Sequence, residues 1–79
     1  MGRKDSNVLV PGASAPAGIN TIKSLRFSDF QGKIISTDSN KLSAGFYLSD
    51  YKEVIPEVEN LNYINVLFDI VEKYNINIS

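Results

Sequence analysis

The chain has 79 residues, of which 43% are hydrophobic and 22% charged, and its formal net charge is −1. A chain of this size forms one domain or part of one, and this composition is globular, which excludes disordered and fibrous classes. Because Cys and His are absent, disulfides, a thiol nucleophile, an imidazole base and an ordinary zinc site are excluded, and the scattered Lys and Arg residues argue against nucleic-acid binding.

The first predicted unit is a strand, a turn and a helix. Residues 8–10 read Val-Leu-Val, residues 11–18 read Pro-Gly-Ala-Ser-Ala-Pro-Ala-Gly, and Ile19, Ile22 and Leu25 then recur at helical spacing. Small residues let a backbone approach a ligand closely, and the first N–H groups of a helix favour an anion. We therefore expect a ligand-binding turn at the carboxyl end of the first strand.

The middle of the chain predicts two further strands. In residues 33–38 the adjacent Ile34 and Ile35 would point to opposite faces of a strand, as expected when both faces are covered. Residues 39–50 are interpreted as a loop with one short helical piece. Residues 51–56 predict a brief third strand that is terminated by Pro56.

The clearest helical pattern begins at Leu61. Asn60 or Asn62 could cap the start of this helix, Asn75 could close it in the left-handed conformation, and residues 76–78 would open a fourth strand. Two aromatic residues of the pattern, Phe68 and Tyr74, are expected to pack in the core. The predicted apolar stripe consists of Leu61, Ile64, Leu67, Phe68, Val71 and Tyr74.

Strands that alternate with helices predict the α/β class and a Rossmann-like parallel sheet of about four strands, with helices on both faces. We interpret residues 1–79 as a single, partial doubly wound domain and as an N-terminal fragment of a longer enzyme. An unpaired sheet edge would then favour a homodimer. No apolar run reaches the roughly 18 residues of a membrane span and no signal-peptide region is present, so we expect a cytoplasmic protein that binds no membrane.

The glycine loop has the spacing of a dinucleotide site. Gly12, Ala15 and Gly18 lie at three-residue intervals, and Asp38 follows Gly18 by 20 residues, where a Rossmann site places the carboxylate for the ribose. The Ala15 methyl and the missing N–H of Pro16 oppose this interpretation. The alternative is that the small residues serve close packing of helix on strand, and that Asp38 bonds its own loop.

Several segments together resemble the N-terminal domain of ATP-grasp enzymes, and especially proteins similar to the large subunit of carbamoyl-phosphate synthase. They are residues 8–18, the Thr-Asp-Ser of residues 37–39, the Leu-Ser-Ala-Gly-Phe-Tyr-Leu-Ser-Asp of residues 42–50, and the Val-Ile-Pro of residues 54–56. Pro11 departs from the small or hydroxylated residue that usually precedes the glycine loop. The resemblance extends over essentially the whole chain.

The resemblance implies a pre-ATP-grasp domain that packs against downstream ATP-grasp domains, its partners in the parent chain. Full-length members join a carboxylate, activated by ATP and magnesium, to an amine, and those cofactors are held mainly downstream. We therefore predict no cofactor, catalytic residue or metal ligand in this chain. An NAD(P)-binding fragment and a self-associating scaffold remain the alternatives. The predicted ligand-binding residues are Gly12, Ala13, Ser14, Ala15, Gly18, Asn20 and Asp38; Ser14 offers a hydroxyl for a ligand or a cap for the helix.

Overall fold

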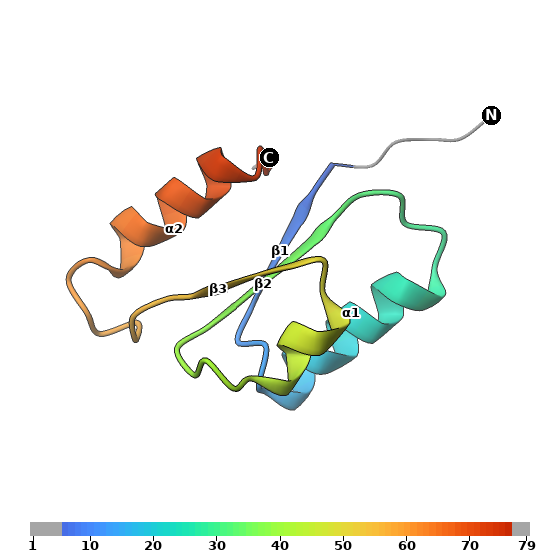
Figure 1. The fold of residues 1–79 in the computed structure, drawn as a ribbon, viewed down its shortest axis with the longest axis horizontal. Coiled ribbons are helices and arrows are strands. Elements are labelled where there is room, and N and C mark those ends of the chain that lie inside the picture. The colour runs from blue at the N-terminus through green and yellow to red at the C-terminus, as the bar shows by residue number, and fades with distance from the viewer. Residues whose placement is uncertain (1–5, 77–79) are drawn as a thin grey trace.

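The computed structural model describes residues 6–76 (Figure 1). Its elements follow in the order β1 (Val8–Pro11), α1 (Pro16–Phe27), β2 (Ile34–Asp38), the 3-10 helix η1 (Ala44–Leu48), β3 (Tyr51–Val54) and α2 (Tyr63–Lys73). The predicted order of elements is thus confirmed up to α2. Within residues 6–76, no helix is both long and apolar enough to cross a membrane.

The sheet is parallel and has the order β1-β2-β3. Val10 lies opposite Ser36, and Thr37 lies opposite Glu53. After α2 the chain returns to β1, where Ile76 forms an isolated parallel bridge with Asn7. This bridge is where the predicted fourth strand would start, but residues 77 and 78 lie outside the described part of the chain. Within residues 6–76 the sheet has three strands, and the arrangement is α/β and Rossmann-like.

The sheet carries a separate apolar cluster on each face. On one face the buried residues Val10, Ile22 and Ile34 form a cluster with half-buried side chains of α1 and η1. On the other face Ile35 packs with Ile70 of α2. The prediction that adjacent isoleucines face opposite ways is confirmed. The connections from β1 to β2 and from β2 to β3 run in the same direction across the sheet and place α1 and η1 on one face. The chain after β3 returns toward β1 and places α2 on the other face (Figure 1).

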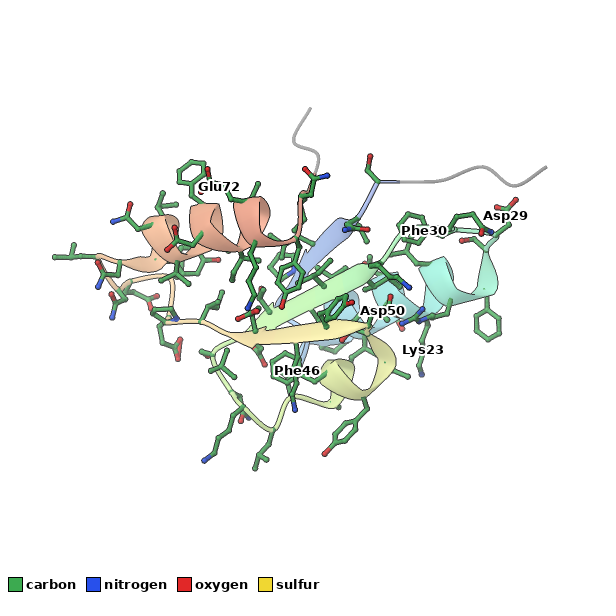
Figure 2. All side chains as sticks on the ribbon, turned by 45° about the horizontal axis from the view of Figure 1, so that its top comes forward. Lys23, Asp29, Phe30, Phe46, Asp50 and Glu72 are labelled. Carbon is green, nitrogen blue, oxygen red and sulfur yellow. The ribbon has the colours of Figure 1, made fainter. Side chains whose placement is uncertain are left out.

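The outer sides of α1 and α2 carry charged residues, whereas η1 buries an aromatic side chain. Figure 2 shows Lys23 of α1 and Glu72 of α2 on the sides that face away from the sheet, and both residues are exposed. Phe46 of η1 is buried with 7% of its surface exposed. Asp50 accepts a hydrogen bond from the Ile34 N–H at 2.7 Å and pairs with Arg26 at 3.4 Å, which ties the end of α1 to the start of β3.

The helix α2 is rotated relative to the predicted apolar stripe. Leu61 is 99% exposed, Ile64 57% and Phe68 58%, so the expectation that Phe68 packs in the core is wrong. The residue that reaches the core is Ile70, which is 4% exposed and was not in the stripe. The inner face consists of Tyr63, Val66, Leu67, Ile70 and Tyr74. Because α2 is apolar on more than one side, its periodicity could not select the buried side.

The predicted helix ends are confirmed only in part. Ala15 is the N-cap of α1 and makes no side-chain cap bond, so Ser14 does not cap this helix. Asn62 is the N-cap of α2, also without a side-chain bond, while the Asn60 side-chain oxygen accepts the Asn62 N–H at 2.8 Å. Asn75 has φ 53°, the left-handed conformation predicted to close α2.

A polar cluster joins β3 to the end of α2. The Lys73 Nζ atom lies 2.8 Å from Glu53 Oε2, and the Tyr74 hydroxyl donates to the same oxygen. The rings of Tyr51 and Tyr74 are 5.2 Å apart between centroids. The hydrogen bond from Lys73, and then that from Tyr74, lower the pKa of Glu53 below its ordinary value of 4.5.

This lowered pKa predicts a loss of stability in acid. Because Glu53 titrates below 4.5 in the folded chain, its ionised form stabilises the fold above 4.5, and that stability is lost as the pH falls through the lowered pKa. Between about pH 6 and about pH 3 we expect the chain to lose about 1 kcal/mol more stability than its Glu53→Gln variant. Urea unfolding at a series of pH values measures this. Glu72→Gln, on the exposed side of α2, should keep the acid loss; equal loss in the chain and in Glu53→Gln would contradict the assignment.

Candidate functional site

The loop after β1 is anchored by Ala13. This residue is fully buried, its N–H donates to the Thr37 carbonyl at 3.1 Å, and its carbonyl accepts the Gly45 N–H at 3.1 Å. The loop is therefore fixed to β2 on one side and to η1 on the other. Ala13 was predicted to contact a ligand, but the structure uses its backbone to hold the loop in place.

Gly18 and Gly45 are packing glycines. A Cβ atom at Gly18 would lie 2.4 Å from the Gly12 carbonyl oxygen, and one at Gly45 would lie 2.3 Å from the Ala13 carbonyl oxygen. Both distances are far shorter than a carbon–oxygen contact allows. The close approach of α1 and η1 to the loop thus requires glycine at these two positions, as the packing interpretation of Gly18 predicted.

Gly12 is glycine for a different reason. Nothing lies within 4 Å of a Cβ atom built there, but its φ is +66°, a conformation that other residues rarely adopt. This conformation turns the chain sharply at the carboxyl end of β1. The Gly12 carbonyl accepts the Ala15 N–H at 2.9 Å, and Pro16 has no N–H, so the turn offers an anion fewer free donors than the sequence suggests.

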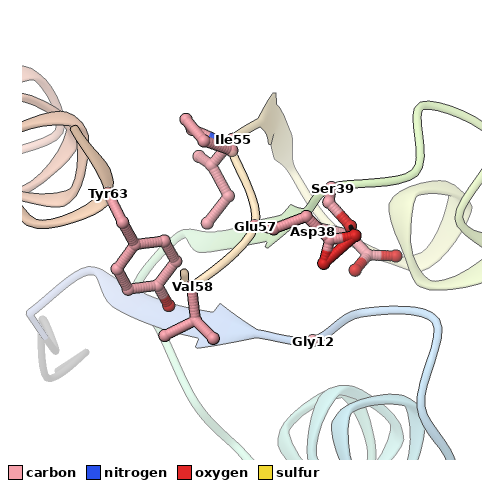
Figure 3. A pocket seen from close by; sticks show the side chains of 8 residues that line it. Gly12, Asp38, Ser39, Ile55, Glu57, Val58 and Tyr63 are labelled. Atoms are coloured by element: carbon pink, nitrogen blue, oxygen red, sulfur yellow. Dashed lines mark hydrogen bonds between the residues drawn. The ribbon is translucent and has the colours of Figure 1, made fainter. Parts of the chain in front are cut away.

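A pocket of about 180 Å³ opens at the carboxyl ends of the strands (Figure 3). It has a polar side, where Asp38, Ser39 and Glu57 lie, and an apolar side with Ile55, Val58 and Tyr63 (Figure 3). Its lining comes from the ends of β1 and β2, from the loop after β3 and from the first residue of α2. The lining residues are Gly12, Asp38, Ser39, Ile55, Pro56, Glu57, Val58 and Tyr63.

Asp38 lines this pocket, and one of its two carboxylate oxygen atoms is buried. Its Oδ2 atom is shielded from solvent and finds no hydrogen-bond donor among residues 6–76. The alternative in which the carboxylate bonds its own loop is therefore wrong for this oxygen. The neighbouring Ser39 instead donates to Glu57 Oε1 at 3.4 Å. A buried acceptor without a donor is uncommon in folded proteins.

The structure brings two of the predicted ligand residues together and separates the others. Gly12 and Asp38 line the same pocket, whereas Ser14, Ala15 and Asn20 are exposed and do not line it. The sequence reasoning missed the contributions of residues 55–58 and Tyr63. The former could have been found, because the carboxyl ends of parallel strands meet at one edge of a sheet. The position of Tyr63 depends on how α2 packs and has no signal in the sequence.

Comparison with known proteins supplies the family. The family model described as "PylC-like, N-terminal domain" matches residues 18–78, which are most of the chain. The match begins at Gly18 and so includes Asp38 and the loop after β3, while residues 12–17 lie outside it. No curated protein matches the chain. The parallel three-stranded sheet agrees with this match. The chain therefore belongs to the family of PylC-like N-terminal domains, the pre-ATP-grasp domains of ATP-grasp ligases.

Proposed function

We propose that this chain is the N-terminal module of an ATP-grasp carboxylate–amine ligase and forms one wall of the substrate cleft, without catalysing the reaction alone. The observation that carries the proposal is the pocket at the carboxyl edge of the sheet, where Gly12 and Asp38 meet. Open α/β sheets bind their ligands at this edge. The family match supports the ligase class, and a parent similar to the large subunit of carbamoyl-phosphate synthase is a narrower form of the same proposal.

ATP and magnesium would be held by other domains of such a ligase. In the part of the chain that the structure describes, no three His, Cys, Asp or Glu side chains gather as a metal site needs. The pocket itself carries the carboxylates of Asp38 and Glu57, which repel a phosphate. The pocket therefore disfavours the phosphates of ATP, and we assign this chain a role in the binding of substrate. A cytoplasmic location, where ATP is supplied, is part of the proposal.

Release of ADP tests the proposed function. The experiment expresses the reading frame that encodes this chain, together with any neighbouring frame that encodes an ATP-grasp domain, both intact and with residues 1–79 deleted. With magnesium, ATP and panels of carboxylates and amines, we expect substrate-dependent ADP release that requires residues 1–79. ADP release that is unchanged by the deletion, or the lack of any ATP-grasp domain in these frames, would overturn the proposal.

Dinucleotide binding is the second candidate, because Gly12 and Asp38 line one pocket as a ribose site requires. The acidic lining disfavours the 2′-phosphate of NADP, so NAD is the form to examine. The test titrates NAD and NADP, each to about 1 mM. At this concentration a ligand with a binding free energy of about −4 kcal/mol is half bound. Saturable amide shifts at Asp38 and at Ser14 would support this candidate. Their absence would set it aside.

Self-association follows from the position of β3 as an outer strand of the sheet. Its outward N–H and C=O groups are a template for a second copy, and Tyr51 and Val54 on this strand are 48% and 54% exposed. We propose a homodimer through this edge as the scaffold alternative. Light scattering over a concentration series measures it. A chain that stays monomeric throughout would remove this alternative.

A further inference from the structure

We infer that the pocket binds the ammonium group of the amine substrate and that Asp38 is the residue that accepts it. This inference rests on the proposed function and specifies it, since it states which of the two substrates meets this wall of the cleft. The juxtaposition that carries it is the Asp38 carboxylate, one oxygen of which is buried without a donor, a second carboxylate and an apolar wall around one open pocket of about 180 Å³.

In the described chain the Asp38 carboxylate has an oxygen atom without a hydrogen-bond donor. Its Oδ2 atom is shielded from solvent, and no donor from residues 6–76 reaches it. A buried acceptor without a partner costs free energy, and a charged one costs more than a neutral one. A ligand in the pocket that donates an N–H group to the Asp38 carboxylate would recover part of that cost. The pocket is thus prepared for a hydrogen-bond donor.

The charged side chains that line the pocket are all negative. Asp38 and Glu57 both line the cavity, and none of its eight lining residues in the described chain is a Lys or Arg. Among residues 6–76 the Glu57 side chain has one hydrogen-bond donor, the Ser39 hydroxyl, at the long distance of 3.4 Å. Two carboxylates without a cation between them attract a positive ligand and repel a carboxylate or phosphate. Among hydrogen-bond donors, a protonated amine fits best.

The wall opposite the carboxylates is apolar. Ile55, Val58 and Tyr63 give the cavity an apolar side that faces the polar one (Figure 3). The volume of about 180 Å³ has room for a primary ammonium group with a short carbon chain. An alkyl chain on this wall and an ammonium group on Asp38 would satisfy both sides of the pocket together.

The test is a titration of the 79-residue chain with n-butylammonium chloride at constant ionic strength, followed by amide NMR shifts. We expect saturable shifts at Gly12, Ser39 and Glu57. Asp38→Asn keeps the shape and removes the charge, and should weaken binding about tenfold or more. Glu57→Gln should weaken it less. The matched control is Asp69→Asn on the exposed side of α2, which should change the affinity by less than about twofold.

Neutral n-butanol has a similar size and separates charge recognition from simple filling of an apolar cavity. Equal shifts with n-butanol, no shift with n-butylammonium, or unchanged affinity in Asp38→Asn would each overturn the inference. The urea midpoint of Asp38→Asn verifies that it folds, and we expect this midpoint to be no lower than that of the original chain. Should Asp38→Asn fail to fold, the affinity of Glu57→Gln and the n-butanol comparison still test whether the pocket recognises the charge of the ligand.

The two proposals fail in different ways. The titration contains no ATP and no other domain, so it does not depend on ligase activity. ADP release that requires residues 1–79, combined with no binding of n-butylammonium, would overturn the ammonium site alone. Binding of n-butylammonium without any such ADP release would overturn the ligase module and leave an ammonium site of another purpose.

Discussion

Replacing Gly18 with Ala is expected to lower the free energy of unfolding by about 2–3 kcal/mol. The added methyl would lie 2.4 Å from the Gly12 carbonyl oxygen and 3.0 Å from the Gly12 carbonyl carbon, both of them backbone atoms that cannot rotate away. To accommodate it, α1 must move away from the loop, which also opens its contact with the core through Ile22. In a chain whose single core supplies roughly 3–5 kcal/mol, this loss removes most of the stability.

Urea unfolding followed by circular dichroism measures the effect of Gly18→Ala. Ser24→Ala is the matched control, because Ser24 is exposed on the same helix and Ala favours helix more than Ser does. This control should leave stability unchanged or raise it by about 0.5 kcal/mol. If Gly18→Ala were as stable as the original chain, the close approach of α1 to the loop would be refuted.

The second large effect is expected at Ile70. This side chain is 4% exposed and packs with Ile35 of β2 and Ile55. Its truncation to Ala should cost about 2–5 kcal/mol, because the apolar burial is lost and a cavity remains beneath α2. Since the whole core is small, we expect Ile70→Ala to be largely unfolded at room temperature.

Phe68 provides the contrast on the same helix. It is larger than Ile70 but 58% exposed, so Phe68→Ala should cost less than about 1 kcal/mol. Thermal unfolding of the two variants side by side gives the comparison. A larger loss for Phe68 than for Ile70 would mean that the stripe predicted from periodicity, and not the observed face of α2, packs on the sheet.

Phe68 lines an apolar hollow between α2 and β1. Ile64, Leu67, Phe68 and Val71 of α2 surround, together with Leu9 of β1, an apolar hollow of about 170 Å³. The four α2 residues of this hollow all belong to the apolar stripe that predicted the helix. Three of the six stripe residues are nevertheless largely exposed. The apolar stripe was therefore a correct indication of a helix, but it indicated the buried side only in part, since Leu67 and Tyr74 are on the inner face and the three exposed residues are not.

The sequence by itself determined the local elements and their faces. Alternation of strands and helices fixed the α/β class, the adjacent Ile34 and Ile35 required cover on both faces of the sheet, and the spacing of Asp38 put a carboxylate at the end of a strand. These properties depend on the backbone repeat, which is two residues in a strand and 3.6 in a helix, so they can be recognised without knowledge of distant contacts.

Only the tertiary structure decided which surfaces meet. The side of α2 that is buried, the contact of Gly45 with Ala13, and the arrival of Tyr63 and Glu57 beside Asp38 all join segments that are distant in the sequence. Local periodicity contains no information about such long-range contacts, because they depend on how the whole chain folds back on the sheet. The unpaired oxygen of Asp38 belongs to this second kind, since a carboxylate is without a donor only once every neighbour is in place.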